Sequence, residues 1–177
     1  MAKLLVLSGP SGAGLGEITA ALFAARPALR AVTPVTARKM KEGEKDGAGF
    51  YFYDLEGWNA LKESGDLLEC TEFAGNDYGT SRRLVLRELD AGHDVLLNLP
   101  PERAAQVKRS MPEALCVYLE PSPAELEKRC RAVSRSELEC RVRLEEAARQ
   151  RDLSGFCDLR LSSDDLPAAA AQLLSLL

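Results

Sequence analysis

A glycine-rich segment near the start of the sequence has the residue types and spacing of a phosphate-binding loop. It follows an apolar run from Lys3 to Ser8 and precedes a helical pattern, so backbone N–H groups and a helix N-terminus would face an anion. The candidate loop residues are Gly9, Ser11, Gly12, Ala13, Gly14, Leu15 and Gly16. Gly9 and Gly14 have the spacing of the pattern G-x-x-x-x-G-K-[ST], but Leu15 and Gly16 replace its lysine and hydroxyl. The loop alone leaves two interpretations open, a phosphate site or a glycine turn that only joins strand to helix.

The elements around this loop alternate between short apolar runs and helical patterns, which is typical of a parallel sheet flanked by helices. Further strands are expected at 94–99, 114–119 and 157–161, and helices at 14–25, 102–111, 123–131 and 137–151 and after Asp164. Ser122 and Pro123 suit the cap and the first position of a helix. We therefore predict an α/β fold, a three-layer core with a parallel sheet flanked by helices.

Residues 33 to about 80 break this alternation. They are richer in Gly and Lys and then give an aromatic run at 50–53, a short helical pattern around 58–64 and an apolar run at 67–74. This segment predicts a small, mainly β subdomain inserted into the α/β core.

Composition excludes several classes of protein. The chain has 177 residues, 46% of them hydrophobic, and a formal net charge of -4, which is too apolar and too weakly charged for a disordered chain. A pI near 5.2 argues against a general nucleic-acid or anionic-membrane binder. No run has the length of a signal peptide or a membrane span, so we expect a cytoplasmic protein. The five cysteines and single histidine predict reduced, mostly buried thiols and no metal site.

Motifs along the whole chain resemble those of the guanylate kinase family. Gly9 to Gly14 reads like that family's G-P-S-G-x-G, Thr36 to Gly47 resembles T-T-R-x-P-R-x-G-E-x-x-G, and Gly75 to Thr80 resembles G-N-x-Y-G-[ST]. Asp164-Asp165-Leu166 resembles the closing N-D-D-L. The resemblance implies one domain, 1–177, with a P-loop core at 1–32, 81–128 and 152–177, a small, mainly β GMP-binding-like subdomain at 33–80 and a short helical lid-like region at 129–151.

The resemblance also implies a pocket for the phosphate of GMP. Arg38 would hold that phosphate with paired hydrogen bonds, whereas Lys41, in place of a family arginine, offers only a point charge. Tyr78 would donate its hydroxyl to the same phosphate, while Phe50 replaces a tyrosine and loses one hydrogen bond.

At the base end of the same pocket, the resemblance implies that Glu69 accepts from the guanine edge and that Thr80 adds a hydroxyl contact. Arg38 and Lys41 alone would also fit a solvated basic turn. Their coincidence with Glu69, Tyr78 and Thr80 favours a monophosphate or anion pocket.

The departures from the family pattern cluster where phosphoryl transfer would occur. That reaction needs positive charge and magnesium at the phosphates. Leu15 and Gly16 remove the lysine and the hydroxyl, and Glu17 adds a carboxylate that we expect to repel a triphosphate. Asn98 and Pro100 replace two acidic positions that contact guanine and position magnesium, and the turn that follows them has become Leu99 to Arg103.

The lid sequence also departs from the family, and Arg129 and Arg143 are its candidate residual arginines. Mg-ATP and GMP are the ligands that the family implies, but we expect weak ATP binding. Beyond these two candidate arginines we assign no catalytic residue.

Three functions follow from these observations. The first is a catalytically impaired guanylate kinase-like protein, a pseudokinase that acts by binding GMP or another phosphate-bearing ligand. The second is a protein-interaction module that uses the old GMP site. The third is an active ATP:GMP phosphotransferase whose cation comes from elsewhere, for instance Lys39 or Arg135. We rank them in this order, and expect neither nucleic acid nor membrane as a partner.

Overall fold

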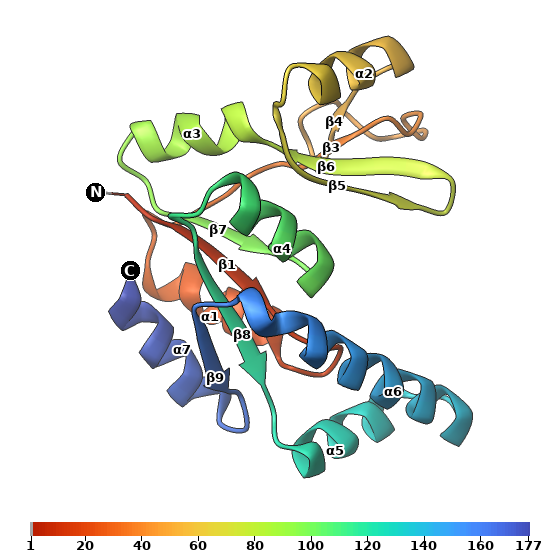
Figure 1. The fold of residues 1–177 in the computed structure, drawn as a ribbon, viewed down its shortest axis with the longest axis vertical. Helices are drawn as coiled ribbons and strands as arrows, with labels where there is room; N and C mark the ends of the chain where they lie inside the picture. Colours follow the sequence, from red (N-terminus) through yellow and green to blue (C-terminus); the bar gives the residue numbers. More distant parts are fainter. Residues whose placement is uncertain (1) are drawn as a thin grey trace.

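The computed structural model describes residues 2–177 and contains two sheets (Figure 1). The larger sheet is wholly parallel and has the order β2-β7-β1-β8-β9. Its strands are β1 (Leu4–Ser8), β2 (Arg30–Ala31), β7 (Val95–Asn98), β8 (Leu115–Glu120) and β9 (Leu159–Ser162). Helices flank this sheet, which confirms the predicted fold class.

Alternating side chains of the central strand β1 build two separate cores. Leu4 and Val6 belong to a buried cluster that includes residues of α4, while Leu5 and Leu7 belong to a cluster that includes residues of α1 and α7. Both sets are apolar because a parallel sheet covered by helices is buried on both faces. The helices are α1 (Leu15–Ala25), α2 (Leu55–Glu63), α3 (Arg82–Asp90), α4 (Pro101–Ser110), α5 (Pro123–Val133), α6 (Glu137–Leu153) and α7 (Leu166–Leu176), with a short 3-10 turn at Ser154–Phe156.

The smaller sheet lies beside the larger one and has the order β4-β3-β6-β5 (Figure 1). Its strands are β3 (Val35–Thr36), β4 (Tyr51–Phe52), β5 (Leu67–Phe73) and β6 (Asn76–Ser81). Trp58 and Leu61 of α2 join Val35 and Leu84 in a core of their own. The segment that interrupts the sequence alternation therefore contains a β-rich unit with its own buried cluster.

Most predicted elements lie within two residues of their observed bounds, but the short strand Arg30–Ala31 was not predicted and others need correction. Arg82–Asp90 is a helix that was not predicted, and the Ser81 hydroxyl accepts from the Leu84 N–H at its start, at 3.3 Å. The last strand is Leu159–Ser162 rather than 157–161, because a 3-10 turn occupies the chain up to Phe156. The helix predicted at 58–64 starts earlier, where Asp54 accepts from the Gly57 N–H at 2.8 Å. The predicted Ser122 cap with Pro123 at the first helical position is confirmed.

No helix within residues 2–177 combines the length and apolar character needed to cross a bilayer.

Candidate functional site

The glycine-rich segment forms a tight loop between β1 and α1. Gly12 and Gly14 have φ of 93° and 82°, a region that favours glycine, and Gly14 is the N-cap of α1. A Cβ at Gly14 would lie 2.3 Å from Leu166 Cδ2, so the loop closely approaches the first turn of α7. No side chain caps α1, which leaves its first N–H groups directed out of the helix end. The backbone thus retains an anion-binding geometry.

The side chains of this loop do not supply the charge that a triphosphate needs. Leu15 packs against the buried cluster formed by β1, α1 and α7, and Leu166 packs against the same cluster. Gly16 and Glu17 are exposed, and a Cβ at Gly16 would contact nothing within 4 Å. The first turn of α1 therefore presents an apolar side chain, an open space and a carboxylate.

Two arginines from α5 and α6 reach the glycine loop. Arg129 donates from Nη1 to the Gly12 carbonyl at 3.2 Å and from Nη2 to the Ser163 carbonyl at 2.8 Å. Arg143 donates from Nη1 to Ser11 Oγ at 3.0 Å. Each guanidinium is also paired on its own helix, Arg129 with Glu125 and Arg143 with Glu139, both at 2.9 Å. The two candidate lid arginines thus donate hydrogen bonds to residues of the glycine loop itself.

A cavity of about 600 Å³ lies between the two sheets. The predicted pocket residues that line it are Phe50, Tyr78, Thr80 and Asn98. Arg38 adjoins it through Phe50, since the Arg38 guanidinium lies 5.7 Å from the centre of that ring, and Phe50 also packs against Tyr78 at 5.7 Å. Lys41 is exposed.

Glu44 occupies the donors of Arg38 beside this cavity. Arg38 donates from Nη1 to Glu44 Oε2 at 3.0 Å and from Nη2 to Glu44 Oε1 at 2.8 Å. The Lys41 backbone N–H donates to Glu44 Oε2 at 2.6 Å. These hydrogen bonds, chiefly that from Arg38, lower the pKa of Glu44 to about 2, and the same pair raises the pKa of Arg38. Arg38 therefore carries an internal anion in the position where it would hold a phosphate.

Glu69 at the other end is buried and fully paired. Its side chain is 0% exposed. Its Oε1 accepts from Thr80 Oγ1 at 2.6 Å and from Arg103 Nη2 at 2.7 Å, and its Oε2 accepts from Arg103 Nε. Arg103 is a residue of this site that was not predicted, since its only distinction in the sequence is to end the altered turn Leu99 to Arg103. An arginine replacing a turn residue beside a carboxylate position was the signal available for it.

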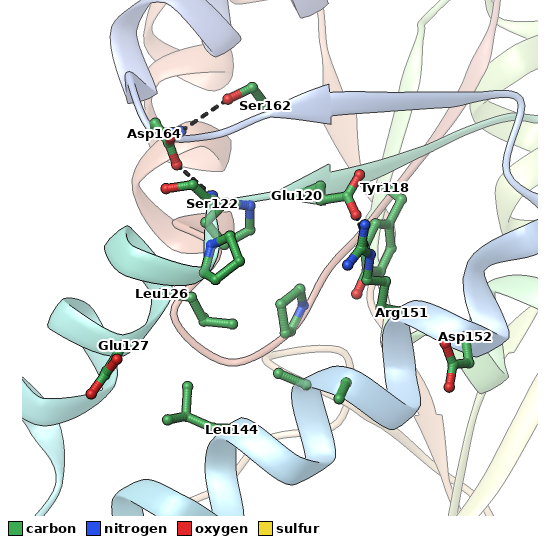
Figure 2. Close-up of a pocket in the computed structure, with 15 residues that line it drawn as sticks. Tyr118, Glu120, Ser122, Leu126, Glu127, Leu144, Arg151, Asp152, Ser162 and Asp164 are labelled. Atoms are coloured by element: carbon green, nitrogen blue, oxygen red, sulfur yellow. Dashed lines mark hydrogen bonds and ion pairs between the residues drawn. The ribbon is translucent and has the colours of Figure 1, made fainter.

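A second cavity of about 620 Å³ lies between α5, α6 and the ends of β8 and β9 (Figure 2). The Tyr118 hydroxyl is buried without a hydrogen-bond partner among residues 2–177, and burial, together with the nearby Glu120 carboxylate, raises the pKa of Tyr118 to about 12. Arg151 pairs with Glu120 beside it at 2.5 Å. None of the predicted site residues lines this cavity.

The thiols take no part in either cavity. All five cysteines are unpaired as disulfides, and burial raises the pKa of Cys116 to about 11 and that of Cys157 to about 12. Both therefore stay protonated at neutral pH and are poor nucleophiles.

The residues around the glycine loop do not fit a magnesium triphosphate. Leu15 offers no cation and Gly16 no hydroxyl, and Asn98 and Pro100 offer no carboxylate at the end of β7. Within residues 2–177 no three His, Cys, Asp or Glu side chains come together in a metal-binding arrangement. Beside the cleft between the two sheets, Arg38 and Arg103 carry N–H donors of the kind that bind anions.

A parallel sheet with a glycine loop between its first strand and first helix defines this chain as an α/β protein of the P-loop kinase type. The chain belongs to the guanylate kinase family, whose sequence model matches residues 1–177.

Curated guanylate kinases match this chain over nearly its whole length. The chain is 39% identical to the guanylate kinase of Parasynechococcus marenigrum, over 100% of this chain and 98% of that protein. It is 36% identical to the guanylate kinase of Desulfitobacterium hafniense, over 98% of this chain and 88% of that protein.

Solved structures support the same fold. The guanylate kinase of Anaplasma phagocytophilum superimposes with a TM-score of 0.67 at 24% identity, over 99% of this chain and 84% of that one. The shikimate kinase of Bacteroides thetaiotaomicron gives a TM-score of 0.53 at 14% identity, over 98% of this chain and 97% of that one.

Proposed function

We propose that this chain is a guanylate kinase homologue that binds GMP or a similar phosphomonoester in the cleft and no longer transfers phosphate efficiently. The observation that carries the proposal is the environment of Leu15. This residue stands in the position of the loop lysine, and its side chain packs into the apolar cluster of β1, α1 and α7. A phosphoryl group in transfer would meet no loop cation there, although its developing charge needs one.

The phosphate end of the cleft supports the binding part of the proposal. Arg38 is a guanidinium with two parallel N–H donors already arranged for a bidentate anion, and Glu44 now takes both. A phosphomonoester with two negative charges competes with a single carboxylate for these donors. Tyr78 lies beside Phe50 and supplies a further hydroxyl at the same cavity.

The remaining assignments are proposals that follow from this one. The core, the GMP-binding-like subdomain at 33–80 and the lid-like region at 129–151 divide the chain by role. Arg129 and Arg143 hold the glycine loop in place rather than a triphosphate, as their bonds to Gly12 and Ser11 suggest. The cytoplasm is the proposed compartment, in keeping with five free thiols.

Calorimetric titration of the purified protein with GMP, GDP and ATP, each with and without Mg²⁺, tests this function. Binding of GMP without binding of ATP is the expected result, and Arg38→Ala should abolish most of the GMP heat. Binding of Mg-ATP by the wild-type chain would contradict the proposal and favour an active kinase. Binding of no nucleotide at all would contradict it in favour of a protein-interaction module.

A further inference from the structure

The base end of the cleft presents a cation where the family resemblance places a carboxylate. Both oxygens of Glu69 are occupied, Oε1 by Thr80 and Arg103 and Oε2 by Arg103 again. The Glu69 side chain has no exposed surface, so a ligand in the cavity cannot reach it without displacing one of these donors.

Arg103 faces the cavity instead. Its side chain is 21% exposed and it lines the cavity together with Thr80 and Asn98. Nε and Nη2 are used by Glu69, whereas Nη1 has no hydrogen-bond partner within residues 2–177. Because a guanidinium has only donors, this end of the cleft offers N–H groups to a ligand.

Anchoring of α4 does not account for the ion pair. Gln106, one turn further along α4, already joins that helix to β5, accepting from the Cys70 N–H at 3.0 Å and donating to the Cys70 carbonyl at 3.1 Å. A buried ion pair is in general weak evidence for a stabilising role, because desolvation offsets its Coulomb energy. Arg103 at the cavity wall is therefore available to contact a ligand.

We propose that Arg103, and not Glu69, contacts the ring of the bound phosphomonoester and that it selects a ring carbonyl rather than a ring amino group. This inference rests on the proposed function, because it names the other end of the ligand that Arg38 holds. Arginine pairs with the O6 and N7 acceptors of a 6-oxopurine. The 2-amino group of guanine is a donor and finds no free acceptor here, because both oxygens of Glu69 already accept hydrogen bonds. The ligand class is thus a 6-oxopurine monophosphate without selection for the 2-amino group.

The test compares three ligands that differ at one end. Ribose 5-phosphate has no ring base, IMP has the 6-carbonyl, and GMP adds the 2-amino group to it. We expect IMP and GMP to bind with equal affinity, within about threefold, and both about tenfold tighter than ribose 5-phosphate, the value of one good base contact. Arg103→Ala should remove the advantage of IMP over ribose 5-phosphate and leave ribose 5-phosphate unchanged. Arg109→Ala, an exposed arginine on the same helix, is the matched control and should change neither.

Each other outcome overturns the inference in a recognisable way. Binding of GMP about tenfold or more tighter than IMP would show that the 2-amino group is read after all. Equal binding of all three ligands would show that the ring is not read, and in both cases the proposed function stands. Failure of ribose 5-phosphate, IMP and GMP alike would remove the proposed function and the inference together. If Arg103→Ala does not fold, the ratio of GMP to IMP affinity in the wild-type protein still decides whether the 2-amino group is recognised.

Discussion

At the glycine loop, the position of the missing cation holds Leu15, whose side chain is part of an apolar cluster. In the cleft between the sheets, by contrast, two arginines are present and each is paired with a carboxylate of the same chain. Arg38 is paired with Glu44, and Arg103 with Glu69. A paired cation can exchange its partner for a ligand, whereas a leucine cannot acquire a charge by any movement. The glycine loop and the cleft therefore differ from the family in different ways. A conformational change can free the arginines of the cleft for a ligand, but it cannot give the loop a cation.

The largest expected effect concerns turnover. With Mg-ATP and GMP, we expect a rate about 10³-fold or more below that of an ordinary guanylate kinase, since loss of one preorganised charged donor alone removes about 10²–10³. A coupled assay for ADP on protein freed of contaminating kinase measures it, with Leu15→Ala as a control that should show the same background. An ordinary rate would show that the glycine loop supports phosphoryl transfer without its lysine, so that the two regions would not differ in function.

The next effect tests the cleft. Arg38→Ala should weaken the binding of GMP by about 1.5–3 kcal/mol, the value of a charged hydrogen bond. Lys41→Ala should cost less and depend more on salt, because Lys41 is an exposed point charge. Calorimetry at two salt concentrations separates the two variants. Equal affinities for wild type and both variants would mean that these cations form only a solvated turn.

Restoring the loop sharpens the comparison from the other side. Leu15→Lys with Gly16→Ser should raise ATP affinity by about tenfold, and a serine is sterically free at position 16 because a Cβ there meets no atom within 4 Å. Adding Glu17→Thr should change it by only about threefold more. An exposed carboxylate at ~6 Å repels a unit charge by roughly 0.7 kcal/mol in water, not by the roughly 3 kcal/mol of a partly buried one. A much larger gain in the triple variant would show that Glu17 acts at close range.

The smallest effect is the pH dependence of GMP binding. The folded-state pKa of Glu44 is lowered from 4.5 to about 2, so its pair with Arg38 is complete above about pH 4.5 and is lost only as the pH falls toward 2. GMP affinity should therefore rise with the second ionisation of its phosphate, near pH 6, and show no inflection between pH 4 and 5. Affinity measured from pH 4 to 8 checks this, and a step near pH 4.5 would mean that Glu44 titrates normally.

The order of strands and helices could be predicted because each apolar run is followed by a helical pattern. The helix Arg82–Asp90 was not predicted, because its apolar residues Leu84, Val85 and Leu86 are consecutive rather than spaced at helical intervals. Its position depends on the Ser81 cap and on the core beside Leu84. The pairing of Arg103 with Glu69 could not be predicted either, since it joins residues 34 positions apart on α4 and β5. Only the packing of α4 against β5 brings these two charges together.

Leu15 also bears on how the protein tolerates heat. A ligand that binds the folded state stabilises it by an amount that grows with the logarithm of its concentration relative to Kd, so an ordinary kinase melts at a higher temperature when its loop is filled. Here the side chain of Leu15 packs against the core and holds the first turn of α1 there without any ligand. The melting temperature should then be indifferent to added Mg-ATP and should respond only to compounds that enter the cleft between the two sheets.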